Sequence, residues 1–245
     1  MTFLFFLIVL PSWVQLRWKS QQPMFSLGLR CSPKKSFFNC FLRGFCFSFA
    51  LVLLILVPIS FSPWVVFQFN ITTYNLLNSI FLGILVGFTE ELIFRGWLFG
   101  EIEFLVRTPF AFVLQAVLFS LIHVFAISQS GIGFLEIISL LIGLFFLGIL
   151  LAIRRVLDNG SLWGCIGLHG GLVGLWFFIN SSLITIGDQA PAWLVGPGSF
   201  SPNPLGSFMG LFYLILILLF YRKAFAIAGF PFNGARRDSS KDAIP

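Results

Sequence analysis

Residues 76–99 read LLNSIFLGILVGFTEELIFRGWLF, and this stretch decides the fold. It is long enough to cross a bilayer, for which a helix needs about 20 predominantly apolar residues. It nevertheless carries three charged residues, Glu90, Glu91 and Arg95. Charged side chains inside membrane spans cost about 2.5–3.5 kcal/mol on insertion scales and by default mark functional sites. The stretch therefore predicts both a membrane helix and the place where chemistry occurs.

The composition of the whole chain supports a membrane protein. Of 245 residues, 58% are hydrophobic, 10% are charged and 34 are Phe. An ordinary soluble domain carries about 25% charged residues, so too few remain here to cover a soluble surface. A disordered chain is excluded too, because it needs low hydrophobicity and high net charge.

Seven apolar stretches can be read along the chain, and six of them are long enough to span a membrane. They are Thr2–Leu16, Phe45–Phe69, Leu76–Phe99, Pro109–Ile127, Phe134–Ile153, Leu162–Asn180 and Leu205–Tyr221. The first is short and contains Pro11, and three interpretations stay open: a signal-like segment, a weak first helix or an interfacial segment. The predicted fold class is all-α, a polytopic transmembrane helix bundle of about 6–7 spans.

The chain divides into three regions by composition. Residues 1–44 form an N-terminal hydrophobic segment and a basic cytosolic linker, and residues 45–222 form the helix bundle. Within the bundle, the catalytic core is expected at about residues 76–180. Residues 223–245 form a polar cytosolic tail.

The basic residues fix the orientation. The net charge is +6, but the loops at 70–75, 128–133 and 181–204 contain no Lys or Arg. The bases cluster before the second stretch, at Arg107, at Arg154 and Arg155, and after Tyr221. Cytosolic loops carry such an excess, so these segments are placed on one side of the membrane. The basic charge therefore needs no nucleic acid as a partner, and membrane lipid is the expected surroundings.

Helical spacing separates the two glutamates. At 100° per residue, Glu91 and Arg95 lie on nearly one face at positions i and i+4 and can pair. Glu90 points elsewhere, about 140° away from Arg95. A buried Glu–Arg pair that only locks helices together would account for Glu91, but it leaves the second carboxylate unexplained.

The two histidines of the chain, His123 and His169, both fall within predicted spans. At 1.5 Å rise per residue, Glu90, His123 and His169 lie about 15, 21 and 12 Å from the cytosolic boundary. All three can therefore meet around one buried water. A carboxylate in an apolar cavity can act as a general base towards water, and a histidine can hold the water or stabilise an oxyanion. Alternatively, Glu90, His123 and His169 could ligate a divalent metal such as zinc.

Three motifs carry a resemblance to a known family. Glu90-Glu91-Leu-Ile-Phe-Arg95 matches an EExxxR motif, Phe119-Ser-Leu-Ile-His123 an FxxxH motif, and Gly160 to His169 the approach to a third motif, HxxxN. In this order and on successive spans, they resemble the CPBP family of intramembrane proteases, also called Abi or CAAX proteases of the Rce1-like type II. The resemblance covers roughly residues 76–178.

The resemblance implies an all-helical membrane protease that opens towards the cytosol, in the plasma membrane or an internal membrane such as the thylakoid. By position, Glu90 would activate water with His123, His169 would stabilise the oxyanion, and Glu91 would position Arg95 and the helix. Family members are often described as metallopeptidases, while a glutamate-based mechanism without a direct metal is also argued; we favour the latter. The substrate would be a peptide or protein, prenylated or otherwise membrane-associated.

One position departs from the family pattern, because Val173 stands where the third motif has Asn. Losing one oxyanion donor typically costs about 10²–10³ in rate. Asn180 lies about 10 Å further along the helix axis than Val173, too far to replace the donor. Two alternatives to a protease therefore stay open: a non-catalytic scaffold or immunity-type protein of the same fold, and a transporter or proton relay.

Overall fold

The computed structural model describes residues 2–30, 36–124, 132–198 and 202–222, with the backbone alone for residues 2–6. The helices are α1 (Thr2–Arg17), α2 (Pro23–Ser26), α3 (Phe37–Ser60), α4 (Thr73–Glu91), α5 (Phe99–Leu105), α6 (Thr108–Ile122), α8 (Phe134–Leu157), α9 (Trp163–Phe178), α10 (Ala192–Val195) and α11 (Phe208–Phe220). Two π-helices, η1 (Leu92–Leu98) and η2 (Ile179–Leu183), continue α4 and α9, and η3 (Pro204–Gly206) is a 3₁₀ turn. The two strands are β1 (Val65–Phe67) and β2 (Ile184–Ile186).

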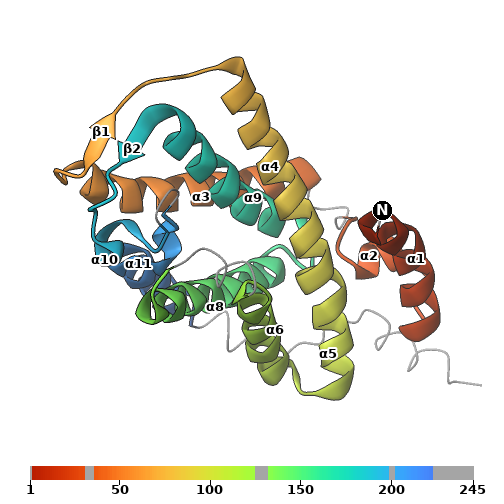
Figure 1. Ribbon diagram of the computed structural model, residues 1–245. Coiled ribbons are helices and arrows are strands. Elements are labelled where there is room, and N and C mark those ends of the chain that lie inside the picture. Colours follow the sequence, from red (N-terminus) through yellow and green to blue (C-terminus); the bar gives the residue numbers. More distant parts are fainter. Residues whose placement is uncertain (1, 31–35, 125–131, 199–201, 223–245) are drawn as a thin grey trace, which may run out of the picture.

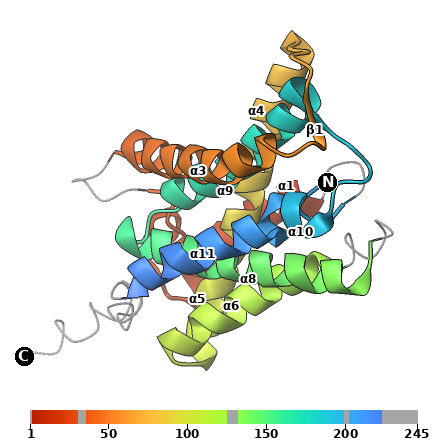
Figure 2. The ribbon, with the colours of Figure 1, turned by 90° about the vertical axis from the view of Figure 1, so that its left-hand side faces the viewer.

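Two helices organise the bundle. Helices α3 and α4 both pack against α9, and helices α6 and α11 both pack against α8 (Figures 1 and 2). Side chains of α3, α8, α9 and α11 share the largest apolar cluster. The predicted all-α class is confirmed. The exception among the described residues is the short antiparallel pair β1–β2, in which Val65 lies opposite Ile186.

Four helices of the described chain are long and apolar enough to cross a membrane. They are Phe37–Ser60, Thr73–Leu105, Phe134–Leu157 and Trp163–Leu183. Two shorter apolar helices, Thr108–Ile122 and Phe208–Phe220, accompany them. Six of the predicted stretches therefore correspond to apolar helices, although two of these are shorter than expected.

The boundaries of two predicted spans are wrong. Helix α3 begins at Phe37, after the extended residue Ser36, and ends at Ser60. The predicted stretch ran to Phe69, but Val65–Phe67 pairs as a strand with β2. At the other end of the chain, α11 begins only at Phe208, because residues Pro204–Gly206 form the 3₁₀ turn η3 instead of its first turn. These corrections arise from turn chemistry, which hydropathy does not report.

The N-terminal stretch forms the continuous helix α1, with Pro11 inside it. It lies beside the lower half of the long α4–α5 helix in Figure 1. Trp13 and Trp18 both donate their indole N–H to Glu101 Oε1, at 2.7 and 2.8 Å. The following turn is joined to the bundle as well, since the Leu162 amide donates to the Gly28 carbonyl at 2.9 Å. In this structure the segment is thus packed against the bundle.

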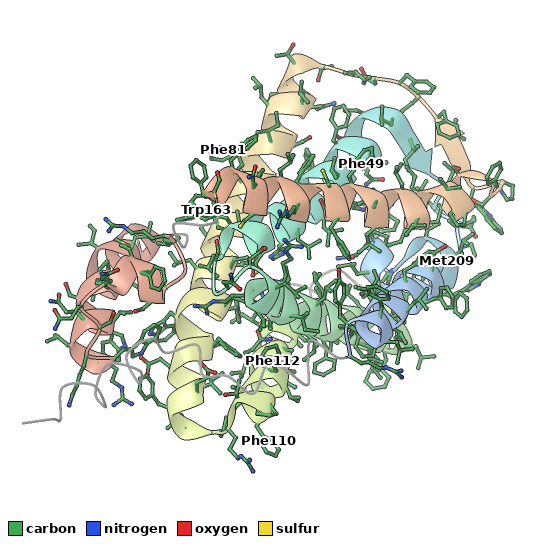
Figure 3. The ribbon with its side chains drawn as sticks, turned by 180° about the vertical axis from the view of Figure 1, so that it is seen from behind. Phe49, Phe81, Phe110, Phe112, Trp163 and Met209 are labelled. Atoms are coloured by element: carbon green, nitrogen blue, oxygen red, sulfur yellow. The ribbon has the colours of Figure 1, made fainter. Side chains whose placement is uncertain are left out.

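Large apolar side chains cover the outside of the bundle. Phe81 on α4 and Phe110 on α6 are each 65% exposed and point outwards, whereas Phe112 is fully buried (Figure 3). Exposed apolar surface on this scale is typical of a membrane-facing protein and not of a soluble monomer. The polar residues that concern function lie inside.

Candidate active site

The first motif lies where the long second span changes its helical form. Glu90 and Glu91 are the last residues of α4, and Arg95 lies in the π-helix η1 that follows without a break. π-helical turns are rare and are often found at functional sites. Here the change of pitch comes directly after the two carboxylates.

A closed network surrounds Glu91. Arg95 Nη1 donates to Glu91 Oε1 at 2.8 Å, and neither side chain has exposed surface. The Nδ1 of His169 lies 2.8 Å from the same oxygen. The expected i,i+4 pair is therefore present, and it also holds a histidine. The Glu91 oxygen accepts from the Arg95 guanidinium and faces His169 Nδ1, so His169 donates from Nδ1 to it.

Phe119 lies at the centre of the site. The guanidinium carbon of Arg95 lies over its ring, 4.1 Å from the centroid. The same ring makes edge-to-face contacts with His123 and His169, with centroids 5.0 and 5.6 Å apart. A buried cation–π contact is worth about 2 kcal/mol. Phe119 thus contacts Arg95 and both histidines at once.

Two further groups, which the sequence analysis did not single out, extend the closed network. Arg95 Nη2 donates to the Gly148 carbonyl at 3.4 Å, and Gln115 Nε2 donates to the same oxygen at 3.0 Å. Gln115 is fully buried. An uncharged polar side chain within an apolar span is a weaker signal than a charge, but it was visible in the sequence.

An open cluster forms around Glu90. Its Oε2 lies 3.7 Å from His123 Nε2 and 3.9 Å from His169 Nε2. This oxygen is buried and makes no hydrogen bond to any described residue. Both separations are too wide for a direct bond and short enough for one water to bond to both partners. The Glu90 side chain as a whole keeps 28% of its surface exposed.

Both histidines present an unprotonated Nε2 to Glu90 when their rings are neutral. His123 Nδ1 lies 2.7 Å from the Phe119 carbonyl, which can only accept, so Nδ1 carries the proton. His169 is fixed in the same tautomer by Glu91. A water between these groups can therefore donate one hydrogen to Glu90 and the other to His123 Nε2, the arrangement that holds and deprotonates a water.

Glycine packing brings His169 to the first motif. Gly170 follows it on α9, and a Cβ there would collide with the Gly83 carbonyl of α4. A Cβ at Gly87 would likewise come within 2.8 Å of the Gly170 Cα. Small residues let membrane helices approach this closely. Without that contact the Nδ1 of His169 could not reach the carboxylate of Glu91.

Glu90, His123 and His169 line a cavity of about 280 Å³. The rest of its lining is largely apolar and comes from α3, α4, α8, α9 and the segment before α11; it consists of Val52, Ile55, Leu82, Val86, Leu144, Leu147, Leu172, Val173, Trp176, Phe177 and Pro202–Leu205. Each of these four helices has one end that leads into a loop without Lys or Arg. The lining residues lie between the site and that end of the helix. The cavity thus extends from Glu90 away from the basic helix ends.

The distances from Glu90 Oε2 to the two histidine nitrogens also test whether a metal ion would fit. In a tetrahedral zinc site with bonds of 2.0–2.1 Å, neighbouring ligand atoms lie about 3.3 Å apart. The separations of 3.7 and 3.9 Å here are wider. Throughout the described part of the chain, no group of three or more His, Cys, Asp or Glu side chains has the arrangement of a metal site. At these distances the three side chains do not form a metal site. That Glu90, His123 and His169 could bind a metal stays a prediction from the sequence.

The five side chains that the sequence analysis selected therefore occupy one site, with Glu91 and Arg95 in the closed network and Glu90 in the open cluster. Their chemical roles stay predictions.

A comparison with known families supports the resemblance. Residues 72–175 match the family model described as Type II CAAX prenyl endopeptidase Rce1-like. This range contains Glu90, Glu91, Arg95, His123 and His169, so the resemblance inferred from the three motifs is confirmed. No curated protein matches the chain. Together with the four apolar helices, the match indicates an integral membrane protein.

Proposed function

We propose that this chain, whose residues 72–175 carry the Rce1-like type II CAAX prenyl endopeptidase pattern, is an intramembrane endopeptidase that uses a glutamate-activated water. The observation that carries the proposal is the convergence of Glu90 Oε2 with the Nε2 atoms of His123 and His169, at 3.7 and 3.9 Å, inside a cavity. Such a convergence matches the requirements of hydrolysis, since a base and a group that orients the water face the same point.

In the proposed reaction, Glu90 accepts a proton from the water while His123 Nε2 accepts a hydrogen bond from its second hydrogen. The oxygen attacks the peptide carbonyl carbon, and the carbonyl oxygen becomes an oxyanion. Glu90 then returns the proton to the amine that leaves when the C–N bond breaks. No atom beyond the water and the peptide is consumed.

Glu91 has a role beside that of Arg95 in this scheme. His169 donates from Nε2 to the oxyanion only when its ring carries both protons. The Glu91 carboxylate at Nδ1 stabilises that positive ring, as the buried carboxylate of a catalytic triad does. Arg95 in turn holds the Glu91 carboxylate in position through the bond from Nη1.

The apolar lining suits a substrate that arrives from the bilayer, such as a prenylated C-terminus or a segment of a membrane protein. Cytosolic access is the expectation from the family resemblance. The lining favours the opposite face, because Trp176, Phe177 and Pro202–Leu205 lie towards the base-free loops. We therefore infer that the substrate reaches Glu90 from the side opposite the basic residues.

Accessibility labelling tests the side of access. A cysteine introduced at Phe177, a half-buried residue of the cavity lining, would be treated with a membrane-impermeant maleimide in oriented vesicles. The chain would carry Ser in place of Cys31, Cys40, Cys46 and Cys165. We expect labelling from the face opposite the C-terminal tail. A cysteine at Leu157, on the basic end of α8, is the matched control and should react from the tail side. Labelling of both positions from the tail side would contradict the inference.

Cleavage assays test the function itself. The purified protein in detergent or nanodiscs would be offered quenched fluorescent peptides ending in a CaaX sequence, with and without a farnesyl group. We expect cleavage that falls by about 10²–10⁴-fold in Glu90→Ala, the range for loss of a general base. Glu136→Gln, far along the chain at the start of α8, is the control and should cleave normally. Equal rates in wild type and Glu90→Ala would refute a glutamate-activated water.

One observation favours a second candidate, a non-catalytic scaffold of the same fold. Val173 lines the cavity where the family motif has an amide. The two candidates separate in cells that lack the endogenous protein: full rescue by Glu90→Gln would favour the scaffold, whereas loss of rescue would favour the enzyme.

A further inference from the structure

The Val173 position leaves the proposed reaction one hydrogen-bond donor short. One turn beyond His169, it presents an apolar side chain to the cavity. Asn203, in the segment before α11, lines the same cavity, and it is the one residue in the described lining that carries a side-chain amide. A single amide facing an otherwise apolar wall is a candidate for the missing role.

The orientation of the Asn203 amide follows from its hydrogen bonds. The Leu205 amide donates to Asn203 Oδ1 at 3.1 Å, so the oxygen end of the side chain is fixed by the backbone. The Nδ2 group is then the opposite end, because a nitrogen in the place of Oδ1 would set two donors against each other. Among the described residues, no group accepts a hydrogen bond from Nδ2. Two N–H donors therefore remain available on a half-buried side chain.

The backbone around Asn203 is held from several sides. Its own amide donates to the Pro197 carbonyl at 2.7 Å. The neighbouring Pro202 carbonyl accepts the Trp176 indole N–H at 2.7 Å, which ties the segment to α9. A Cβ at Gly143 of α8 would collide with the Leu205 carbonyl, so the segment lies directly on that helix. Donors that are fixed before the reaction stabilise developing charge without a reorganisation cost.

We propose that Asn203 is a catalytic residue that donates an Nδ2 hydrogen bond to the oxyanion of the tetrahedral intermediate, in place of the amide absent at Val173. The inference rests on the proposed peptidase function. Asn203 gains and loses no covalent bond in this role. It acts together with His169 Nε2, which lines the same cavity.

The substitution Asn203→Asp tests the donor, because a carboxylate can still accept from the Leu205 amide but offers no N–H. On the farnesylated CaaX peptide, we expect kcat to fall by about 10²–10³-fold, the cost of one oxyanion donor, with little change in KM. Asn203→Ala should lose a comparable factor. Asn78→Ala, on α4 outside the cavity lining, is the matched control. Melting temperatures within a few degrees of wild type would exclude unfolding as the cause.

A rescue experiment separates a lost donor from a damaged loop. Adding Val173→Asn to Asn203→Ala should restore kcat at least tenfold, because it supplies an amide from α9. If the double variant recovers nothing while it stays folded, the donor role is overturned.

The failures of the two proposals are distinguishable. If Asn203→Asp cleaves at the wild-type rate while Glu90→Ala is inactive, the Asn203 role falls and the peptidase stands. If wild type shows no Glu90-dependent cleavage of any peptide offered, the proposed function falls, and the role of Asn203 falls with it.

Discussion

Glu90 and Glu91 are adjacent in the sequence and have the same chemistry, yet they lie in opposite surroundings. Glu91 has no exposed surface and shares one oxygen between Arg95 and His169, each at 2.8 Å. Glu90 keeps 28% of its side chain exposed, and its Oε2 makes no hydrogen bond to a described residue. The difference supports the proposed division of roles, in which Glu91 holds the site together and Glu90 takes up the proton. A group that must take up and release a proton cannot already be held by two donors.

The sharpest way to break this comparison is to replace each carboxylate by its amide. Glu91→Gln leaves the buried Arg95 without a counter-charge, which costs about 3–5 kcal/mol in comparable buried pairs. We expect a large fall in the thermal unfolding temperature of the purified protein, and loss of cleavage as well. Glu90→Gln should unfold like wild type and lose only cleavage, because its partners are not bonded to it. Equal destabilisation by both substitutions would contradict the division of roles.

A smaller loss of stability is expected at Phe119, which lies between the closed network around Glu91 and the open cluster around Glu90. Phe119→Leu removes the ring that contacts Arg95, His123 and His169. We expect a loss of about 2 kcal/mol in stability from the cation–π contact. Because both histidines lose a contact, cleavage should fall as well, measured as kcat on the same peptides. Phe110→Leu, on the same helix and 65% exposed, is the control and should change neither. A Phe119→Leu protein with wild-type stability and kcat would show that the ring only fills space.

The sequence predicted the parts of this site that depend on spacing within one helix. The pairing of Glu91 with Arg95 follows from the 100° periodicity, and so does the separation of Glu90 from it. The bond between His169 and Glu91 could not be predicted, because it depends on which face α9 presents to α4. That face is set by backbone contact between Gly83 and Gly170, residues that a motif search records only as small.

The fold was predicted to a similar extent. Hydropathy located the membrane helices, but the ends of α3 and α11 were wrong. Helix α3 ends at Ser60, before strand β1, and α11 begins only after the turn at Pro204–Gly206. Asn203 was missed for the same reason. It lies outside the motifs, and it reaches the cavity only because the segment before α11 folds back onto α8 and α9.

The helix lengths have a consequence for the lipid around the protein. The helix Thr73–Leu105 has 33 residues, which is about 50 Å at 1.5 Å per residue and exceeds the roughly 30 Å hydrocarbon core. The apolar helices Thr108–Ile122 and Phe208–Phe220 are only about 22 and 20 Å long by the same rise. A helix longer than the hydrocarbon core tilts, whereas the bilayer becomes thinner around a helix that is too short. The hydrophobic mismatch therefore predicts a locally thin membrane beside α6 and α11, which shortens the path of water to a carboxylate buried near the midplane.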